Sequence, residues 1–165
     1  MKVAFRVDSS AQIGSGHLMR CLTLANELRS RGAEVLFLSC EHPGHLIEWI
    51  EKADFALCRF PTPRTQSVSD SNAHGIWLED IQERDAAQTL RALDNQRYDW
   101  LIVDHYRLDA TWEKAVRPLA AKILVIDDLA NRPHDCELLL DQNYFGDKTS
   151  SRYQALLSES CKCLL

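Results

Sequence analysis

The chain has 165 residues, of which 45% are hydrophobic and 26% charged, a composition typical of one soluble globular domain. Its formal net charge of −5, without a run of lysine or arginine, argues against a nucleic acid or an acidic membrane surface as a partner. Arg6 and Asp8 in the first apolar stretch argue against a signal peptide, and no stretch approaches the roughly 20 apolar residues that cross a bilayer, so we expect a cytoplasmic protein without a membrane partner.

Apolar runs rich in β-branched residues predict the strands. Most of these runs lack strict alternation of apolar and polar residues, which is typical of strands buried on both faces of a parallel sheet. In chain order the predicted strands cover residues 2–7, 33–39, 55–60, 99–104, 122–127 and 137–141.

Segments with helical periodicity lie between the predicted strands. The first has an apolar stripe from Leu18 to Leu28, and Gly32 follows as the expected C-terminal cap. The others are residues 46–53, 85–93 and 111–121. This alternation of strands and helices predicts a Rossmann-like, doubly wound α/β fold with a parallel sheet.

Two segments depart from the alternation. Residues 61–75 are rich in proline, serine and asparagine without an apolar period, and we interpret them as a long surface loop, either a mobile lid or a plain excursion. The last residues, SESCKCLL, end on an apolar pair, as if the sequence stopped before its next element.

The cysteines do not indicate a disulfide framework. Most of them lie in or beside apolar runs, as reduced thiols of a protein core do: Cys21, Cys40, Cys58 and Cys136. Cys161 and Cys163 have no further cysteine or histidine at the spacing of a zinc site. We therefore predict reduced thiols and no metal at these positions.

The segment DSSAQIGSGHLMR, residues 8–20, joins the first predicted strand to the first predicted helix. Ligands of open parallel sheets bind beyond the carboxyl ends of the strands, where such a loop meets its helix. Gly14, Ser15 and Gly16 allow a tight turn and expose backbone N–H groups at a helix N-terminus, which favours an anionic substrate. Met19 replaces the third glycine of the dinucleotide motif, and no P-loop string exists, so neither nucleotide-cofactor motif is met.

His17 lies in the first turn of this helix, at the top edge of the apolar stripe. The helix dipole disfavours an imidazolium at an N-terminus, so the ring is kept neutral and able to accept a proton. His17 is therefore a candidate general base, although a core histidine bonded to a carbonyl would give the same spacing. Arg20 either reaches a phosphate or covers the helix surface.

Further polar side chains follow two other strands and are expected at the same edge of the sheet. Asp104, His105 and Tyr106 follow one strand, and Asp127 and Asp128 follow the next. Paired aspartates can hold magnesium, but an Asp-Asp pair after a strand also serves as a helix cap or a solvated turn. We predict that these loops converge with the glycine loop, and we predict no metal.

Three segments resemble, in order, the UDP-sugar hydrolases of pseudaminic acid biosynthesis: FRVDSSAQIGSGHLMRCLTLA (5–25), DWLIVDHYRLDATWE (99–113) and KILVIDDLANRPHDCELLLDQN (122–143). Members of that family release UDP from UDP-2,4-diacetamido-2,4,6-trideoxy-β-L-altropyranose and are similar to the two-domain GT-B glycosyltransferases. The resemblance implies that residues 1–160 form the N-terminal, base-carrying domain. It also implies that the second, UDP-binding domain is absent from this chain.

The resemblance further implies that water attacks the anomeric carbon with inversion, without a metal or another cofactor. His17 would be the base, and Tyr106 would bind the sugar or the attacking water. Polar groups of the same loops are the candidates for substrate binding: Asp8, Gly14, Ser15, Gly16, Arg20 and His105.

Without the second domain, the resemblance predicts weak or no activity for this chain and self-association through an exposed cleft face. Two other functions stay open. One is the acceptor-side half of a GT-B glycosyltransferase, which passes the sugar to an alcohol. The other is a non-catalytic Rossmann-like domain that binds a small anion or a partner chain.

Overall fold

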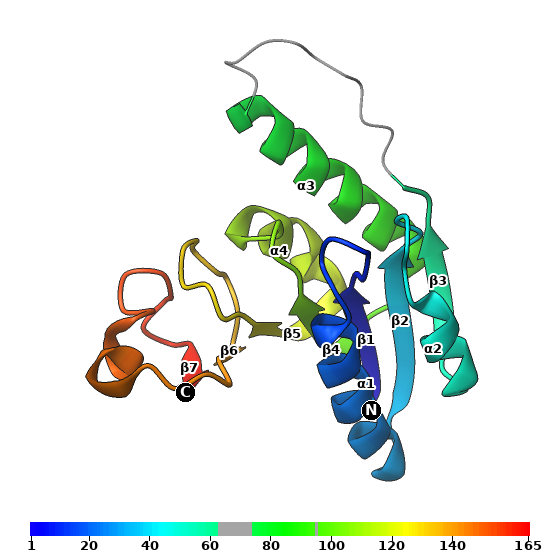
Figure 1. Ribbon diagram of the computed structural model, residues 1–165, viewed down its shortest axis with the longest axis horizontal. Coiled ribbons are helices and arrows are strands. Elements are labelled where there is room, and N and C mark those ends of the chain that lie inside the picture. The colour runs from blue at the N-terminus through cyan, green and yellow to red at the C-terminus, as the bar shows by residue number, and fades with distance from the viewer. Residues whose placement is uncertain (63–73, 95) are drawn as a thin grey trace.

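A computed structural model describes residues 1–62, 74–94 and 96–165 as a seven-stranded parallel sheet with helices on both faces (Figure 1). The strands are β1 (Lys2–Val7), β2 (Glu34–Cys40), β3 (Ala56–Phe60), β4 (Tyr98–Asp104), β5 (Ala120–Ile126), β6 (Leu138–Leu140) and β7 (Lys162–Leu164). The helices are α1 (Gly16–Ser30), α2 (Ile47–Lys52), α3 (His74–Ala92) and α4 (Ala110–Val116), with 3₁₀ turns η1 (Arg117–Leu119) and η2 (Gly146–Ser151).

The strand order is β3-β2-β1-β4-β5-β6-β7, and each neighbouring pair is parallel. The chain runs outward from β1 to β3 and then crosses back to place β4 on the other side of β1. The loops after β1 and β4 therefore leave the sheet in opposite directions. Open α/β sheets bind their ligands at such a switch point, beyond the carboxyl ends of the strands.

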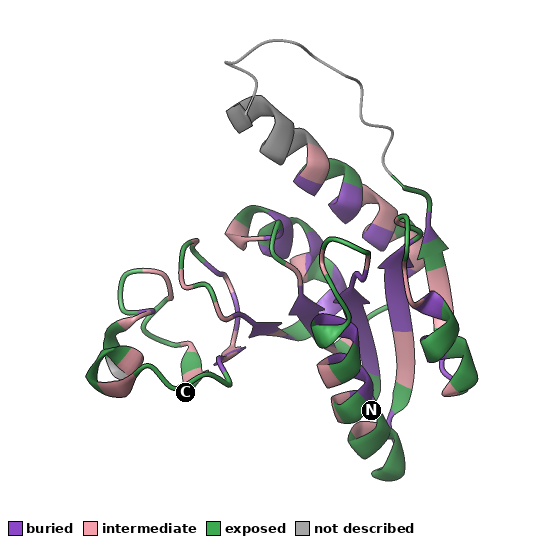
Figure 2. Ribbon diagram, viewed as in Figure 1, coloured by how far each residue is buried: buried purple, intermediate pink, exposed green. Residues whose placement is uncertain are grey.

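Both faces of the central strands are buried, as the sequence predicts (Figure 2). In β1, Val3 and Phe5 pack with the buried side chains of α1 and α2, whereas Ala4 packs with those of α3 and α4. The apolar stripe of α1 is buried on the first of these faces. This helix ends as predicted, because Gly32 follows it with a φ of +84°, a left-handed conformation that glycine adopts readily.

The observed elements differ from the predicted ones in three places. Helix α3 begins at His74 rather than at residue 85, and most of the predicted loop at 61–75 lies outside the described residues. Helix α4 ends at Val116, because Pro118 follows in a 3₁₀ turn and the next strand has already begun at Ala120. The C-terminal residues form β7, which was not predicted and which pairs with β6.

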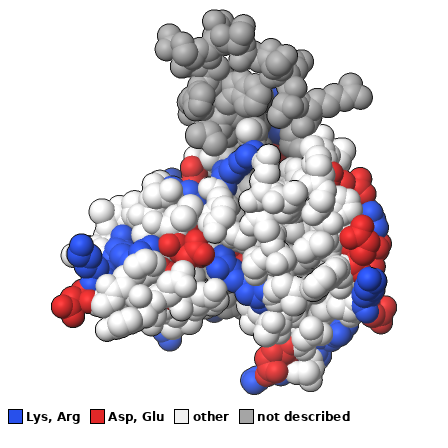
Figure 3. Space-filling model, in the orientation of Figure 1, with Lys and Arg blue, Asp and Glu red and all other residues white. Residues whose placement is uncertain are grey.

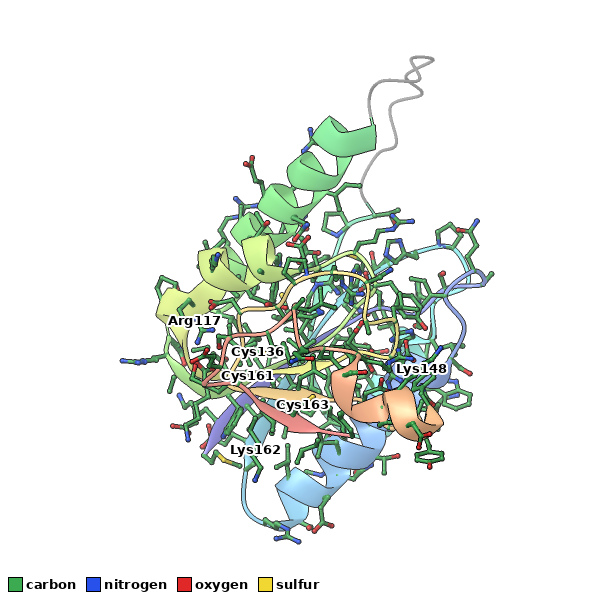
Figure 4. The ribbon with its side chains drawn as sticks, turned by 90° about the vertical axis from the view of Figure 1, so that its left-hand side faces the viewer. Arg117, Cys136, Lys148, Cys161, Lys162 and Cys163 are labelled. Carbon is green, nitrogen blue, oxygen red and sulfur yellow. The ribbon has the colours of Figure 1, made fainter. Side chains whose placement is uncertain are left out.

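The β6 and β7 side of the sheet holds a group of cysteines, Cys136, Cys161 and Cys163, labelled in Figure 4. The Sγ atoms of Cys136 and Cys161 are 3.6 Å apart and share a hydrogen bond rather than a disulfide, and the cysteines of the chain are free thiols. Burial raises the pKa of the Cys136 thiol well above its usual value, which keeps this thiol protonated.

A buried arginine lies in the core together with its two carboxylate partners. Arg6 of β1 is 1% exposed, and its guanidinium contacts Asp8 and, on α3, Asp85, each at 2.5 Å. Burial alone would lower the pKa of Arg6, but the two carboxylates outweigh burial and raise it. The indole N–H of Trp112 donates to Asp85 at 2.9 Å. Arg6 thus joins β1 to α3 and to the loop that follows β1.

The surface carries mixed charge. On the face drawn in Figure 3, basic and acidic side chains are interspersed. Of the helices in the described residues, none combines the length and apolar character that a membrane span requires.

Candidate active site

The β1–α1 loop makes a tight turn before the helix begins. The Ser10 hydroxyl accepts from the N–H of Ile13 at 2.9 Å, and the N–H of Gly14 donates to the Ser10 carbonyl, also at 2.9 Å. Gly14 has a φ of +83°, a left-handed conformation that glycine adopts without the steric cost of a side chain. Ser15 is the N-cap residue of α1, but its side chain caps no N–H, so the first turn, which begins at Gly16, presents its amides without a side-chain partner.

The side chains of His17 and Asp104 are hydrogen-bonded at the carboxyl edge of the sheet. His17, in the first turn of α1, is 5% exposed, and its Nδ1 contacts the Oδ1 of Asp104, the last residue of β4. A carboxylate only accepts hydrogen bonds, so a neutral imidazole donates from Nδ1 and keeps its lone pair on Nε2. Nε2 is therefore the nitrogen that can take a proton from a ligand.

Arg20, one helical turn after His17, binds the same carboxylate. Its Nε lies 2.5 Å from one oxygen of Asp104 and its Nη2 lies 2.6 Å from the other, while Nη1 lies 3.2 Å from Asp128, which follows β5. Burial would raise the pKa of Asp104, but the hydrogen bonds from Arg20 and His17 outweigh burial and lower it. Asp104 is thus held ionised.

Tyr106 lies directly against His17. The two ring centroids are 4.3 Å apart and the rings are perpendicular, while 42% of Tyr106 is exposed. Partial burial and the nearby negative charge of Asp128 raise the pKa of the Tyr106 hydroxyl, which therefore stays protonated and able to donate. The structure brings together the two residues that were predicted to be catalytic.

Asp8 is engaged within the protein. Its oxygens accept from Arg6, from the N–H of Cys40 at 2.8 Å and from two histidine Nε2 atoms, those of His42 at 3.0 Å and His105 at 3.1 Å. Burial opposes the ionisation of Asp8, but Arg6 and the histidines outweigh burial and hold its pKa well below the usual value. This carboxylate ties the ends of β1, β2 and β4 together.

Both ring nitrogens of His105 have partners. Nδ1 accepts from the backbone N–H of Arg107 at 3.1 Å, so Nε2 carries the proton and donates to Asp8. Arg132 donates to the His105 carbonyl at 3.1 Å. His105 is therefore fixed in position, with its ring turned toward β1.

The chemistry of the described side chains is unfavourable for a metal at this edge. Potential ligand atoms of Asp8, Cys40 and His42 lie within 4.8 Å of one another. The cationic Arg6 already contacts Asp8 and lies 3.4 Å from the Cys40 sulfur, and burial raises the pKa of that thiol to about 12. A metal ion would have to displace a buried cation and deprotonate a buried thiol.

The parallel sheet, with helices on both faces and a histidine and carboxylate pair at its switch point, defines the chain as a Rossmann-like α/β domain. Among solved structures it is similar to MurG of Acinetobacter baumannii, a GT-B fold, with a TM-score of 0.56 and 12% identity. The similarity covers 87% of this chain and 41% of MurG. The predicted fold class is confirmed, and this likeness is one of fold alone.

In sequence, the chain is 30% identical over 163 residues to the UDP-2,4-diacetamido-2,4,6-trideoxy-β-L-altropyranose hydrolase of Campylobacter jejuni, which confirms the predicted resemblance. The match covers 98% of this chain and 48% of the hydrolase. An uncharacterised protein of Methanocaldococcus jannaschii is 27% identical over 128 residues, which are 78% of this chain and 22% of that protein. The chain thus spans about half or less of these relatives, and no protein-family model matches it.

Proposed function

We propose that this chain is the base-carrying half of a hydrolase that releases UDP from a diacetamido-trideoxy sugar. The observation that carries the proposal is the pairing of His17 with Asp104, which leaves Nε2 as the proton acceptor beside Tyr106. The similarity to the C. jejuni hydrolase supports the choice of substrate.

In the proposed reaction, Nε2 of His17 takes a proton from water as the water oxygen bonds to the anomeric carbon. The bond between that carbon and the phosphate oxygen breaks, and UDP leaves with the electron pair. UDP is a good leaving group and needs no strong general acid, so one base suffices. Attack from the side opposite UDP inverts the anomeric centre.

The remaining predicted contacts differ in which polar atoms are open to a substrate. Tyr106 is partly exposed, and its protonated hydroxyl, which is hydrogen-bonded with Asp128, would turn to bind the sugar or the attacking water. The amides of Gly16 and His17, in the first turn of α1, have no capping side chain and suit the negative diphosphate, while Gly14 and Ser15 shape the turn before them. Asp8 and His105, whose polar atoms are already bonded, would act on the substrate through the loops that they hold.

We assign the uridine contacts and the rest of the diphosphate contacts to a second domain outside residues 1–165. The support is that the chain covers 48% of the hydrolase that it matches. The sugar side of the substrate would then meet this chain, and UDP alone would bind it weakly.

Binding to residues 1–165 tests this assignment directly. We expect the free sugar product, added in millimolar excess, to shift the NMR signals of the His17 ring and the Tyr106 ring, and we expect UDP alone to leave them nearly unchanged. Incubation of a two-domain protein with the UDP-sugar in water then separates a hydrolase from a glycosyltransferase, which needs an alcohol acceptor. Unchanged signals with both the sugar and the UDP-sugar would contradict the proposal.

Replacement of Tyr106 by phenylalanine is expected to lower kcat/KM for UDP release by about fivefold to tenfold, the effect of one lost hydrogen bond. The melting temperature should stay nearly the same, because Tyr106 is partly exposed and phenylalanine keeps its ring against His17. Tyr144→Phe, at a residue that is 86% exposed, is the matched control. Lower stability with unchanged turnover would make Tyr106 a structural residue.

A further inference from the structure

Two side chains, His17 and Arg20, share one carboxylate at the centre of the site. The oxygens of Asp104 are contacted by the His17 ring and, in a bidentate arrangement, by the guanidinium of Arg20. Arg20 is itself close to the ring, with Nη2 at 3.3 Å from the His17 Nδ1. The guanidinium is permanently charged, whereas the imidazole gains its charge only on binding a proton.

We propose that Arg20 is a positioning residue that disfavours protonation of the His17 ring and so favours the action of His17 as a base. The inference rests on the proposed function, in which His17 takes a proton from water. Arg20 would have two effects on the ring. Its guanidinium binds both oxygens of Asp104, which limits how strongly that carboxylate favours an imidazolium. It also places a positive charge beside the ring.

The charges around His17 come from three elements of the fold. Besides Arg20, α1 contributes the thiol of Cys21, whose pKa burial raises, so it stays neutral. The loop after β4 contributes Tyr106, whose hydroxyl also stays neutral. The charged groups of this cluster are one cation and two carboxylates: Asp104 and Arg20, which approach the ring directly, and Asp128 of the loop after β5, which contacts Arg20.

The direction of the effect follows from this set. With Arg20 replaced by a neutral side chain, both carboxylates keep their charge and lose their cation, so they favour the protonated ring more strongly. Repulsion between the guanidinium and the imidazolium disappears at the same time. Both changes act in one direction, and His17 then takes up a proton at higher pH than in the unmodified chain.

The test is an NMR titration of the His17 ring in residues 1–165, with its signals assigned by their loss in His17→Asn. We expect Arg20→Gln to raise the midpoint of proton uptake by about one pH unit, an ordinary size for the loss of one neighbouring charge. Arg20→Lys, which keeps the charge but loses the planar fork, should give a smaller rise. Arg31→Gln, at the C-cap residue of the same helix, where the side chain is 74% exposed, is the matched control.

In a two-domain protein, the acidic limb of the pH profile of kcat/KM should move in the same direction and by a similar amount. Midpoints in Arg20→Gln and Arg20→Lys that equal the midpoint in Arg31→Gln would overturn the proposal, and if Arg20→Gln does not fold, Arg20→Lys decides alone. Full activity of His17→Asn would instead reject His17 as the base, whatever the titration of the ring shows. The two hypotheses therefore fail separately.

Discussion

Replacement of His17 by asparagine is expected to lower the rate of UDP release by at least about a hundredfold, the lower end of the range for the loss of a general base. Asparagine fills much of the same space and can still donate to Asp104, but it has no basic nitrogen in place of Nε2. The rate is measured in a two-domain protein that carries residues 1–165 as its first half, at saturating UDP-sugar.

Because His17 is 5% exposed, the variant needs a check of its folding by circular dichroism and by its melting temperature. His45→Asn, the same substitution in the loop before α2, is the matched control and should leave the rate unchanged. Near-normal turnover by folded His17→Asn would remove the residue from the reaction.

The largest effect on stability is expected for Arg6→Met. Methionine retains much of the apolar stem but removes the guanidinium, and Asp8 and Asp85 are then left as carboxylates in the core without their cation. Breaking a buried ion pair from one side costs about 3–5 kcal/mol of unfolding free energy. Urea unfolding at pH 7, followed by tryptophan fluorescence, measures the loss.

Arg59→Met is the matched control, because Arg59 lies on β3 of the same sheet but is 41% exposed in its pairs with Glu41 and Glu51. Exposed ion pairs contribute little to stability, so this variant should unfold nearly as the unmodified chain does. Equal losses in the two variants would mean that the buried pairs contribute no more than surface pairs.

The cost of Arg6→Met should also depend on pH. Arg6 holds the pKa of Asp8 below its usual value of 3.8, so the stability that this pair contributes is complete above about pH 4 and is lost as the pH falls through the lowered pKa. In the variant, Asp8 binds a proton more readily. The difference in unfolding free energy between the two proteins should therefore shrink in acid, and a constant difference from pH 7 to pH 3 would contradict this account.

The local sequence was sufficient to predict most of the sheet. Strands buried on both faces form long apolar runs, and this is why the runs from β1 to β6 could be placed to within about two residues. β7 spans only Lys162–Leu164 and is too short to show a pattern. The helix predicted at residues 85–93 is shorter than α3, because the apolar period of the sequence is clear only in the second half of that helix.

The sequence was sufficient to predict which residues gather at the carboxyl edge of the sheet, but not which hydrogen bonds they form there. Parallel strands bring their carboxyl ends together, so His17 and Tyr106 could be expected to meet. Which carboxylate pairs with which cation depends on side-chain conformations that no local pattern encodes. Asp104 was placed at the edge without a partner, and Asp8 was assigned to the substrate although its charge is used by Arg6.

The pair formed by His17 and Asp104 joins residues 87 positions apart in the chain, one on the helix after β1 and one at the end of β4. The base is therefore complete only after the return crossover has docked β4 beside β1, a late event for contacts of such long range. A refolding experiment should thus recover helical signal before it recovers the environment of the His17 ring. In the folded protein, a transient separation of β1 from β4 would break the bond between His17 and Asp104 while α1 stays helical. The activity would then depend on how stably these two strands are paired.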